Sequence, residues 1–192
     1  MKYTSDSAED VNSSMNNNVR KEIKQKIKSS TIEYRKEASE IITEKLFALD
    51  EYKNAKTIFV YNSVFEEVDT SLIIKNALRQ GKIVCLPRVN GDNMNAVRID
   101  ESTKYELSVY NIGEPVSGDI IDTIDLSIIP LVAFDEQKHR LGHGKGYYDR
   151  FLSTHDCIKI ALAFSIQKTS YIEISKSDVD MDMIITEKEV CK

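Results

Sequence analysis

Apolar residues recur every four positions over residues 19–27, and lysine or arginine stands at most positions between them. This spacing predicts an amphipathic helix with a basic outer face. Ser30, followed three residues later by Glu33, matches a capping box. We therefore expect a second helix over residues 32 to about 49.

Short runs of β-branched and aromatic residues predict buried strands. "TIFVY" (57–61) is the first, and "KIVCL" (82–86) is the next, which Pro87 is expected to stop. Between them, "SLIIKNALRQ" predicts a helix that Asp69 or Thr70 caps and Gly81 ends. Four later runs also predict strands: "NAVRI" (95–99), "LSIIPLVAF" (126–134), "IKIALAF" (158–164) and "MDMIIT" (181–186). In addition, "NIGEPVSGD" (111–119) predicts a loop, and "YYDRFLST" predicts a short helix.

The strand–helix–strand order, with strands that are apolar throughout, favours a parallel sheet covered on both faces. We interpret residues 19–192 as one α/β domain. The first 18 residues are rich in Ser, Asn and Asp, and they predict a disordered tail.

Composition narrows the function classes. The chain has 192 residues and a net charge of −5, which gives no general attraction to nucleic acid or to an anionic membrane. No apolar stretch approaches the roughly 20 residues that a membrane span needs. Cys85, Cys157 and Cys191 are widely spaced, which indicates a reducing compartment rather than a disulfide framework. We expect a cytoplasmic monomer.

The stretch "RLGHGKGYYDRF" (140–151) holds three of the seven glycines. It follows a predicted buried strand and precedes a predicted helix, where parallel α/β sheets bind ligands. Backbone amides freed by glycines, together with Arg140 and Lys145, favour an anion. The stretch matches neither common phosphate-binding fingerprint, so the residues alone leave a phosphate loop and a structural turn both open.

The longer stretch "LVAFDEQKHRLGHGKGYYDRFL" resembles the signature of the 5-formyltetrahydrofolate cyclo-ligases, also called methenyltetrahydrofolate synthetases. "EVDT" (67–70), "LPR" (86–88), "ALAF" (161–164) and the ending "SDVDMDMIIT" extend the resemblance over residues 19–186. It implies a three-layer α/β/α domain with a mostly parallel central sheet. It also implies that ATP and Mg²⁺ drive the conversion of 5-formyltetrahydrofolate to 5,10-methenyltetrahydrofolate, with release of ADP and phosphate.

The resemblance also implies roles for individual residues. Lys145 and Arg140 are the expected catalytic residues, and Asp149 and Asp178 are the expected Mg²⁺ ligands. The residues expected at ATP are Arg20, Lys21, Arg140, Leu141, Gly142, His143, Gly144, Lys145, Gly146, Tyr147 and Tyr148. Those expected at the folate are Asn62, Glu67, His143, Gly144, Lys145, Gly146 and Tyr147.

Two positions depart from the family pattern. Asn16 stands where a nucleotide-contacting lysine is expected, four residues before Arg20, so Lys21 or Lys24 is a candidate substitute. His143 stands between two glycines, where an arginine or another residue is often found.

Each assignment has a structural alternative. A basic stripe such as that of residues 20–28 is usually a solvated helix face, and Asp149 is placed to pair with Arg150 or to cap a helix. Two other functions compete: a sugar-phosphate isomerase on a related fold, and a nucleotide- or folate-binding module without catalysis. The lack of an evident base on a nearby loop counts against the first. The joint presence of Lys145, Asp149, Asp178 and Glu67 counts against the second.

Overall fold

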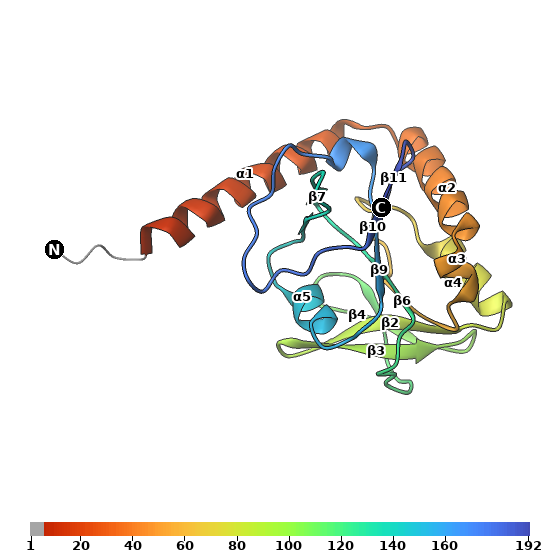
Figure 1. Cartoon of the computed structure of the whole chain (residues 1–192). Helices are drawn as coiled ribbons and strands as arrows, with labels where there is room; N and C mark the ends of the chain where they lie inside the picture. Colours follow the sequence, from red (N-terminus) through yellow and green to blue (C-terminus); the bar gives the residue numbers. More distant parts are fainter. Residues whose placement is uncertain (1–5) are drawn as a thin grey trace.

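A computed structural model of the chain describes residues 6–192, with side chains from residue 14 onwards. Its centre is a seven-stranded sheet in the order β11-β10-β9-β6-β1-β2-β3 (Figure 1). Strands β10, β9, β6, β1 and β2 run parallel, and the edge strands β3 and β11 run antiparallel to their neighbours. The bounds are β1 Thr57–Val60, β2 Ile83–Asn90, β3 Asn93–Ile99, β6 Leu126–Ile129, β9 Ile158–Leu162, β10 Met183–Ile185 and β11 Val190–Cys191. The mostly parallel sheet expected from the strand pattern is confirmed.

Helices cover both faces of this sheet, as the three-layer expectation requires. Helices α2, α3 and α4 pack on one face, and α5 packs on the other. Helix α1 lies across one end, against the two-stranded sheet of β7 and β8 and against the short helix η1 (Figure 1). The bounds are α1 Asp6–Ser29, α2 Ile32–Ala48, α3 Asp50–Asn54, α4 Ser71–Arg79, α5 Tyr147–Leu152, η1 Ser165–Gln167, β7 Ala133–Phe134 and β8 Arg140–Leu141.

The parallel strands are largely apolar because successive side chains enter two different cores. In β1, Ile58 and Val60 face the α2–α4 side, while Phe59 faces the α5 side and packs on Phe151 with ring centroids 4.4 Å apart. Strand β9 repeats this division. Side chains alternate across a strand, so both of its faces have to be apolar when both are buried.

The first helix extends further than expected. The predicted boundary at residue 19 lies inside α1, because the helix continues back to Asp6, and residues 6–18 are helical rather than a disordered tail. Residues 1–5 of that predicted tail lie outside the described part of the chain. The second helix begins at Ile32 as expected, but its cap is Thr31, whose hydroxyl accepts from the Tyr34 amide at 3.0 Å. Ser30 instead donates to the Ile27 carbonyl and ends α1.

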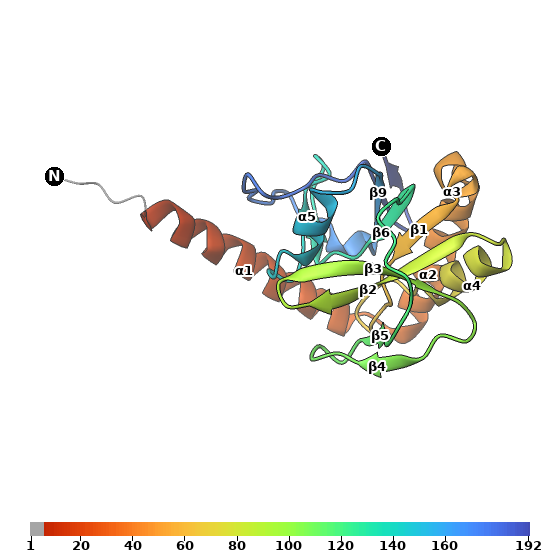
Figure 2. The same cartoon turned by 90° about the horizontal axis from the view of Figure 1, so that it is seen from below.

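Three loop and strand predictions were wrong. Strand β2 continues through Pro87, because it pairs with β1 only as far as Cys85 and beyond that has β3 alone as partner, where a missing amide proton is tolerated. The predicted strand 126–134 divides at Pro130 into β6 and β7. The predicted loop 111–119 contains β5 (Gly113–Pro115), which pairs with β4 (Tyr105–Leu107) in a hairpin beside β2 (Figure 2).

Across residues 6–192, no helix combines the length and the apolar character that crossing a membrane would require.

Candidate active site

A cavity of about 1010 Å³ opens at the carboxyl ends of the parallel strands, where Tyr61 follows β1 and Pro130 follows β6. This edge is where parallel α/β sheets bind ligands. Among the residues expected at ATP, folate or Mg²⁺, all but Lys21 line the cavity. They are Arg20, Asn62, Glu67, Arg140, Leu141, Gly142, His143, Gly144, Lys145, Gly146, Tyr147, Tyr148, Asp149 and Asp178.

The glycines of the loop are needed for its path. Gly144 and Gly146 have φ angles of +88° and +67°, which other residues rarely adopt. A side chain at Gly142 would place its Cβ 2.8 Å from a guanidinium nitrogen of Arg140. The loop therefore lets backbone and Arg140 approach closely. This geometry explains the cluster as both a turn and one wall of the cavity.

Arg140 and Asp149 form an ion pair in the cavity wall. Nη2 of Arg140 donates to Oδ1 of Asp149 at 2.6 Å, and the arginine side chain is only 3% exposed. Its Nε is buried and has no hydrogen-bond partner among the described residues. A buried donor without an acceptor is costly, so a ligand oxygen reaching Nε would relieve that cost. The guanidinium also lies 5.7 Å from the ring centroid of Tyr148.

Glu67 and His143 lie close together in the cavity wall. Oε1 of Glu67 lies 3.9 Å from Nε2 of His143, and Oε2 accepts from the Val64 amide at 3.0 Å. The second bond closes the turn from Val64 to Glu67, so the carboxylate is held in a fixed place. Its side chain is 11% exposed, and Oε1 keeps its acceptor capacity because no hydrogen bond to it is formed among the described residues.

Two adjacent tyrosines play different parts. Tyr148 is half-buried, and burial followed by the nearby carboxylates of Glu67 and Glu114 raises its pKa, against an opposing effect of Arg140. Its hydroxyl therefore stays protonated and polar inside the cavity wall. Tyr147 instead stands edge-on to Tyr110, with ring centroids 6.4 Å apart. The pair forms an aromatic rim suited to a flat ring.

Helix α1 contributes Arg20 to the cavity. Nε of Arg20 donates to the Gly142 carbonyl at 2.8 Å, so the helix is joined to the glycine loop. Burial lowers the pKa of this guanidinium, and the charge of Asp178 acts in the opposite direction. Lys21 and Lys24 are exposed on α1 and do not line the cavity, whereas Asn16 does. Neither lysine takes the expected place of the family's N-terminal lysine.

The two expected Mg²⁺ ligands lie near each other, since Oδ1 of Asp149 also accepts from the Val179 amide at 3.4 Å. Oδ2 of Asp178 accepts from the Ser175 amide at 2.7 Å. Each carboxylate thus keeps one oxygen outside these bonds, and a hard donor of that kind fits Mg²⁺. Within the described residues, no group of three or more His, Cys, Asp or Glu side chains could hold a metal ion alone.

Sequence reasoning missed two parts of the wall. The β4–β5 hairpin supplies Tyr110, Ile112 and Glu114, and Asn62 holds it by donating to the Gly113 carbonyl at 2.9 Å. Asn62 thus anchors the hairpin as well as lining the cavity. The second part is the segment from Ile172 to Ser175. No motif marks either stretch, because only their approach in the fold brings them to the site.

The arrangement can bind a large, flat and polyanionic pair of ligands. Arg20, Arg140 and Lys145 supply positive charge at the glycine loop, and exposed Lys145 has no ion pair among the described residues. Beside the loop, the aromatic rim offers a stacking surface, and Glu67 offers a hydrogen-bond acceptor. Phosphoryl chemistry between two such ligands depends mainly on positioning and charge neutralisation.

Comparison with known proteins identifies the family. A model of the 5-formyltetrahydrofolate cyclo-ligase family matches residues 12–187. The 5-formyltetrahydrofolate cyclo-ligase of Mus musculus is 34% identical over 186 residues, spanning 88% of this chain and 92% of the relative. That of Mycoplasma pneumoniae is 35% identical over 177 residues, spanning 90% and 98%. The solved 5,10-methenyltetrahydrofolate synthetase of Aquifex aeolicus superposes with a TM-score of 0.84 at 30% identity, covering 93% of this chain and 92% of that one. The chain belongs to the 5-formyltetrahydrofolate cyclo-ligase family.

Proposed function

We propose that this cavity is where the chain carries out its family's reaction, the ATP-dependent conversion of 5-formyltetrahydrofolate to 5,10-methenyltetrahydrofolate. The observation that supports this most directly is the convergence of Arg20, Glu67, Lys145 and Asp178 on one cavity. These residues lie far apart in the chain, and each stands at a position to which the family's pattern gives a role.

The reaction needs an activated formyl carbon. The formyl oxygen attacks the γ-phosphorus of ATP, the bond to ADP breaks, and the oxygen becomes a phosphate leaving group. The neighbouring folate amine then attacks the formyl carbon and closes the five-membered ring, and inorganic phosphate and the amine proton depart. Lys145 lies on the glycine loop, where it would neutralise charge on the transferred phosphoryl group. Arg140 would supply its free Nε to a phosphate oxygen.

The remaining residues bind and orient. Backbone amides from Leu141 to Tyr148 would hold the triphosphate, and Arg20 would add a charge from α1. Glu67 would accept hydrogen bonds from the pterin, whose ring would lie against Tyr147. Asp149 and Asp178 would hold Mg²⁺, which, when bound with ATP, offsets the negative charge of the phosphates.

We also propose that the enzyme acts as a monomer in the cytoplasm. One chain supplies every lining residue described, so the site is formed without a second copy. Cys85, Cys157 and Cys191 are all free thiols, which suits a reducing compartment. Sedimentation velocity at micromolar concentration should give a single species near the mass of one chain.

An activity assay tests the proposal. Purified protein with 5-formyltetrahydrofolate, Mg²⁺ and ATP should produce the absorbing methenyl product, and omission of ATP should abolish it. Lys145→Met should lower kcat/KM at least about a hundredfold, in the range seen when a transition-state charge partner is removed. Lys21→Met is the matched control, since Lys21 is an exposed lysine outside the cavity, and it should leave the rate unchanged. Absence of product from the wild type, or equal effects of the two variants, would contradict the proposal.

A further inference from the structure

The side chain of Asn16 makes two hydrogen bonds to a single distant residue. Its Nδ2 donates to the Glu173 carbonyl at 2.8 Å, and its Oδ1 accepts from the Glu173 amide at 3.3 Å. These bonds satisfy both backbone groups of Glu173 and join α1 to the chain 157 positions later. A lysine, which is a donor only, cannot make this paired contact.

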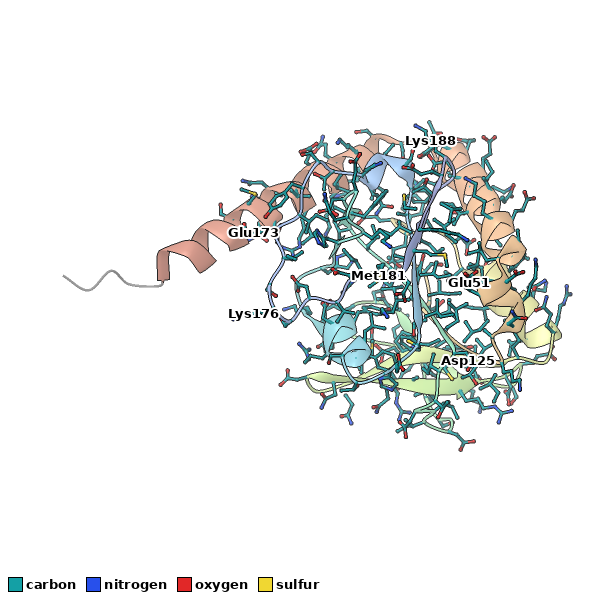
Figure 3. The ribbon with its side chains drawn as sticks, viewed as in Figure 1. Glu51, Asp125, Glu173, Lys176, Met181 and Lys188 are labelled. Atoms are coloured by element: carbon teal, nitrogen blue, oxygen red, sulfur yellow. The ribbon has the colours of Figure 1, made fainter. Side chains whose placement is uncertain are left out.

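Glu173 begins a segment that has few other attachments. Before it, Ile172 is buried and its amide donates to Asp135. After it, residues 174–178 are exposed, and the chain next reaches the protein body at Val179, whose amide donates to Asp149. Figure 3 shows Glu173 beside α1, and Lys176 further along this segment, near α5. The Asn16 contact is therefore the support closest to the exposed stretch on its N-terminal side.

This segment forms one wall of the cavity. Glu173, Ile174, Ser175 and Asp178 all line it, and Asp178 is fixed within the segment by its bond to the Ser175 amide. One helical turn after Asn16, on the same face of α1, Arg20 donates to the Gly142 carbonyl. Helix α1 thus holds the glycine loop with one side chain and segment 173–178 with another.

We propose that Asn16 is a positioning residue that holds segment 173–178 in place for nucleotide binding. Asn16 binds the backbone of Glu173 and thereby fixes the positions of Ser175 and Asp178 in the cavity wall. Asn16 carries no charge and does not replace the cation expected there from the family pattern. The inference rests on the proposed function for its kinetic test, but not for its structural one.

The structural test is hydrogen exchange of the full chain without ligand. Asn16→Ala removes both bonds, and Asn16→Asp removes the 2.8 Å donor while keeping the side-chain shape. In both variants, amide exchange over residues 173–178 should rise about tenfold, which corresponds to about 1.4 kcal/mol. Asn18→Ala is the matched control, an exposed asparagine two positions along the same helix, and it should leave exchange in this segment unchanged.

The kinetic test separates positioning from a merely structural role. In Asn16→Ala, the KM for ATP should rise about tenfold while kcat stays within about twofold, since no reacting group is removed. The melting temperature should fall by no more than a few degrees. Unchanged exchange in segment 173–178 would overturn the proposal. So would a lowered melting temperature with an unchanged KM for ATP. Lack of ATP-dependent activity in the wild type would contradict the proposed function instead. The hydrogen-exchange result would then still test whether Asn16 holds segment 173–178 in place.

Discussion

Several charged side chains of the cavity form hydrogen bonds or ion pairs with other groups of the same chain in the absence of ligand. Asp149 pairs with Arg140, Glu67 closes a turn through the Val64 amide, and Arg20 holds the Gly142 carbonyl. These contacts place each group within a narrow range of positions, which is the preorganisation that charge stabilisation requires. Substitutions at these residues should therefore affect both structure and function, and the balance between the two differs from one residue to the next.

Glu67→Gln should weaken folate binding far more than ATP binding. The amide keeps the shape and an acceptor for the Val64 amide but loses the charge that strengthens hydrogen bonds to a pterin. Calorimetry should show the folate Kd raised about tenfold or more, and the ATP Kd changed by less than about threefold. Glu66→Gln is the control, because Glu66 is adjacent but does not line the cavity. A larger change in the Kd for ATP than in the Kd for folate would contradict the assignment of Glu67 to the folate site.

Asp149→Asn should reduce turnover and also cost stability. The sequence predicts Asp149 as a metal ligand, and the structure also pairs it with the Arg140 guanidinium, whose side chain is 3% exposed. Removing the carboxylate charge leaves Arg140 buried without its counter-ion, so urea unfolding should show a loss of about 1–3 kcal/mol. Asp50→Asn, at an 85% exposed side chain paired with Lys53, should change stability by less than about 0.5 kcal/mol. Equal stabilities of Asp149→Asn and the wild type would show that the ion pair contributes nothing.

The regular elements of the fold could be predicted because each carries its own periodicity. Ile58 and Val60 face one core and Phe59 the other, so the run "TIFVY" reports its burial directly. The β4–β5 hairpin gave no such signal, since its β4 side chains are exposed and Asn62, some fifty residues earlier, holds it in place. The part of α1 before residue 19 was missed for a similar reason. Apart from Met15, its residues 14–18 are polar, and the role of Asn16 follows only from its contact with Glu173.

The same limit applied to the site. The motif "RLGHGKGYYDRF" could be placed at the cavity because its glycines and charges are contiguous. Tyr110 and Glu114 could not, because nothing near them in the chain points to a ligand. Their place depends on the hairpin folding back over β2 (Figure 2). The sequence therefore predicts the site residues that lie together in one motif, but not the parts of the cavity wall that long-range contacts bring to it.

The C-terminal part of the chain is fastened to α2 and η1 through Glu187. Its carboxylate accepts from the Tyr34 hydroxyl at 2.8 Å and from the amide and hydroxyl of Ser165. Burial raises the pKa of Glu187, but the hydrogen bonds from Ser165 and Tyr34 outweigh it, and the net pKa is lowered. This stabilisation is complete above the ordinary glutamate pKa of about 4.3 and is lost as the pH falls through the lower folded value.

Glu187→Gln should therefore destabilise the protein at neutral pH and have little effect in acid. Urea unfolding should show a difference of about 1 kcal/mol between wild type and variant at pH 7, shrinking toward zero near pH 3. Glu189→Gln is the control, since that carboxylate is 49% exposed and pairs with Lys168 at the surface. A difference that stays constant with pH would show that the charge of Glu187 plays no part in the junction.

The molecule as a whole is acidic, and the cationic side chains of its cavity lie at the glycine loop. A net charge of −5 is combined with a glycine loop that carries Arg140 and Lys145 and faces Arg20 from α1. The attraction for a triphosphate would therefore be local to the glycine loop, while the net charge of the whole molecule disfavours nonspecific binding of polyanions. The cavity walls come from α1, the strand ends, the hairpin and the segment before β10, so a ligand would contact elements from most of the chain.

Because the walls come from so many elements, a bound nucleotide should stabilise one cooperative unit. A non-hydrolysable ATP analogue with Mg²⁺, at a hundred times its Kd, adds about 2.7 kcal/mol to the stability of the folded state. For a chain of this length each kcal/mol raises the melting temperature by about 2–4 °C, so calorimetry should show a single transition shifted upward by about 5–10 °C. At the same analogue concentration, Lys145→Ala should shift less, and Lys21→Ala should match the wild type. Two transitions, of which only one responds to the analogue, would mean that the chain is not a single domain. Equal shifts in the two variants would mean that Lys145 does not contribute to nucleotide binding.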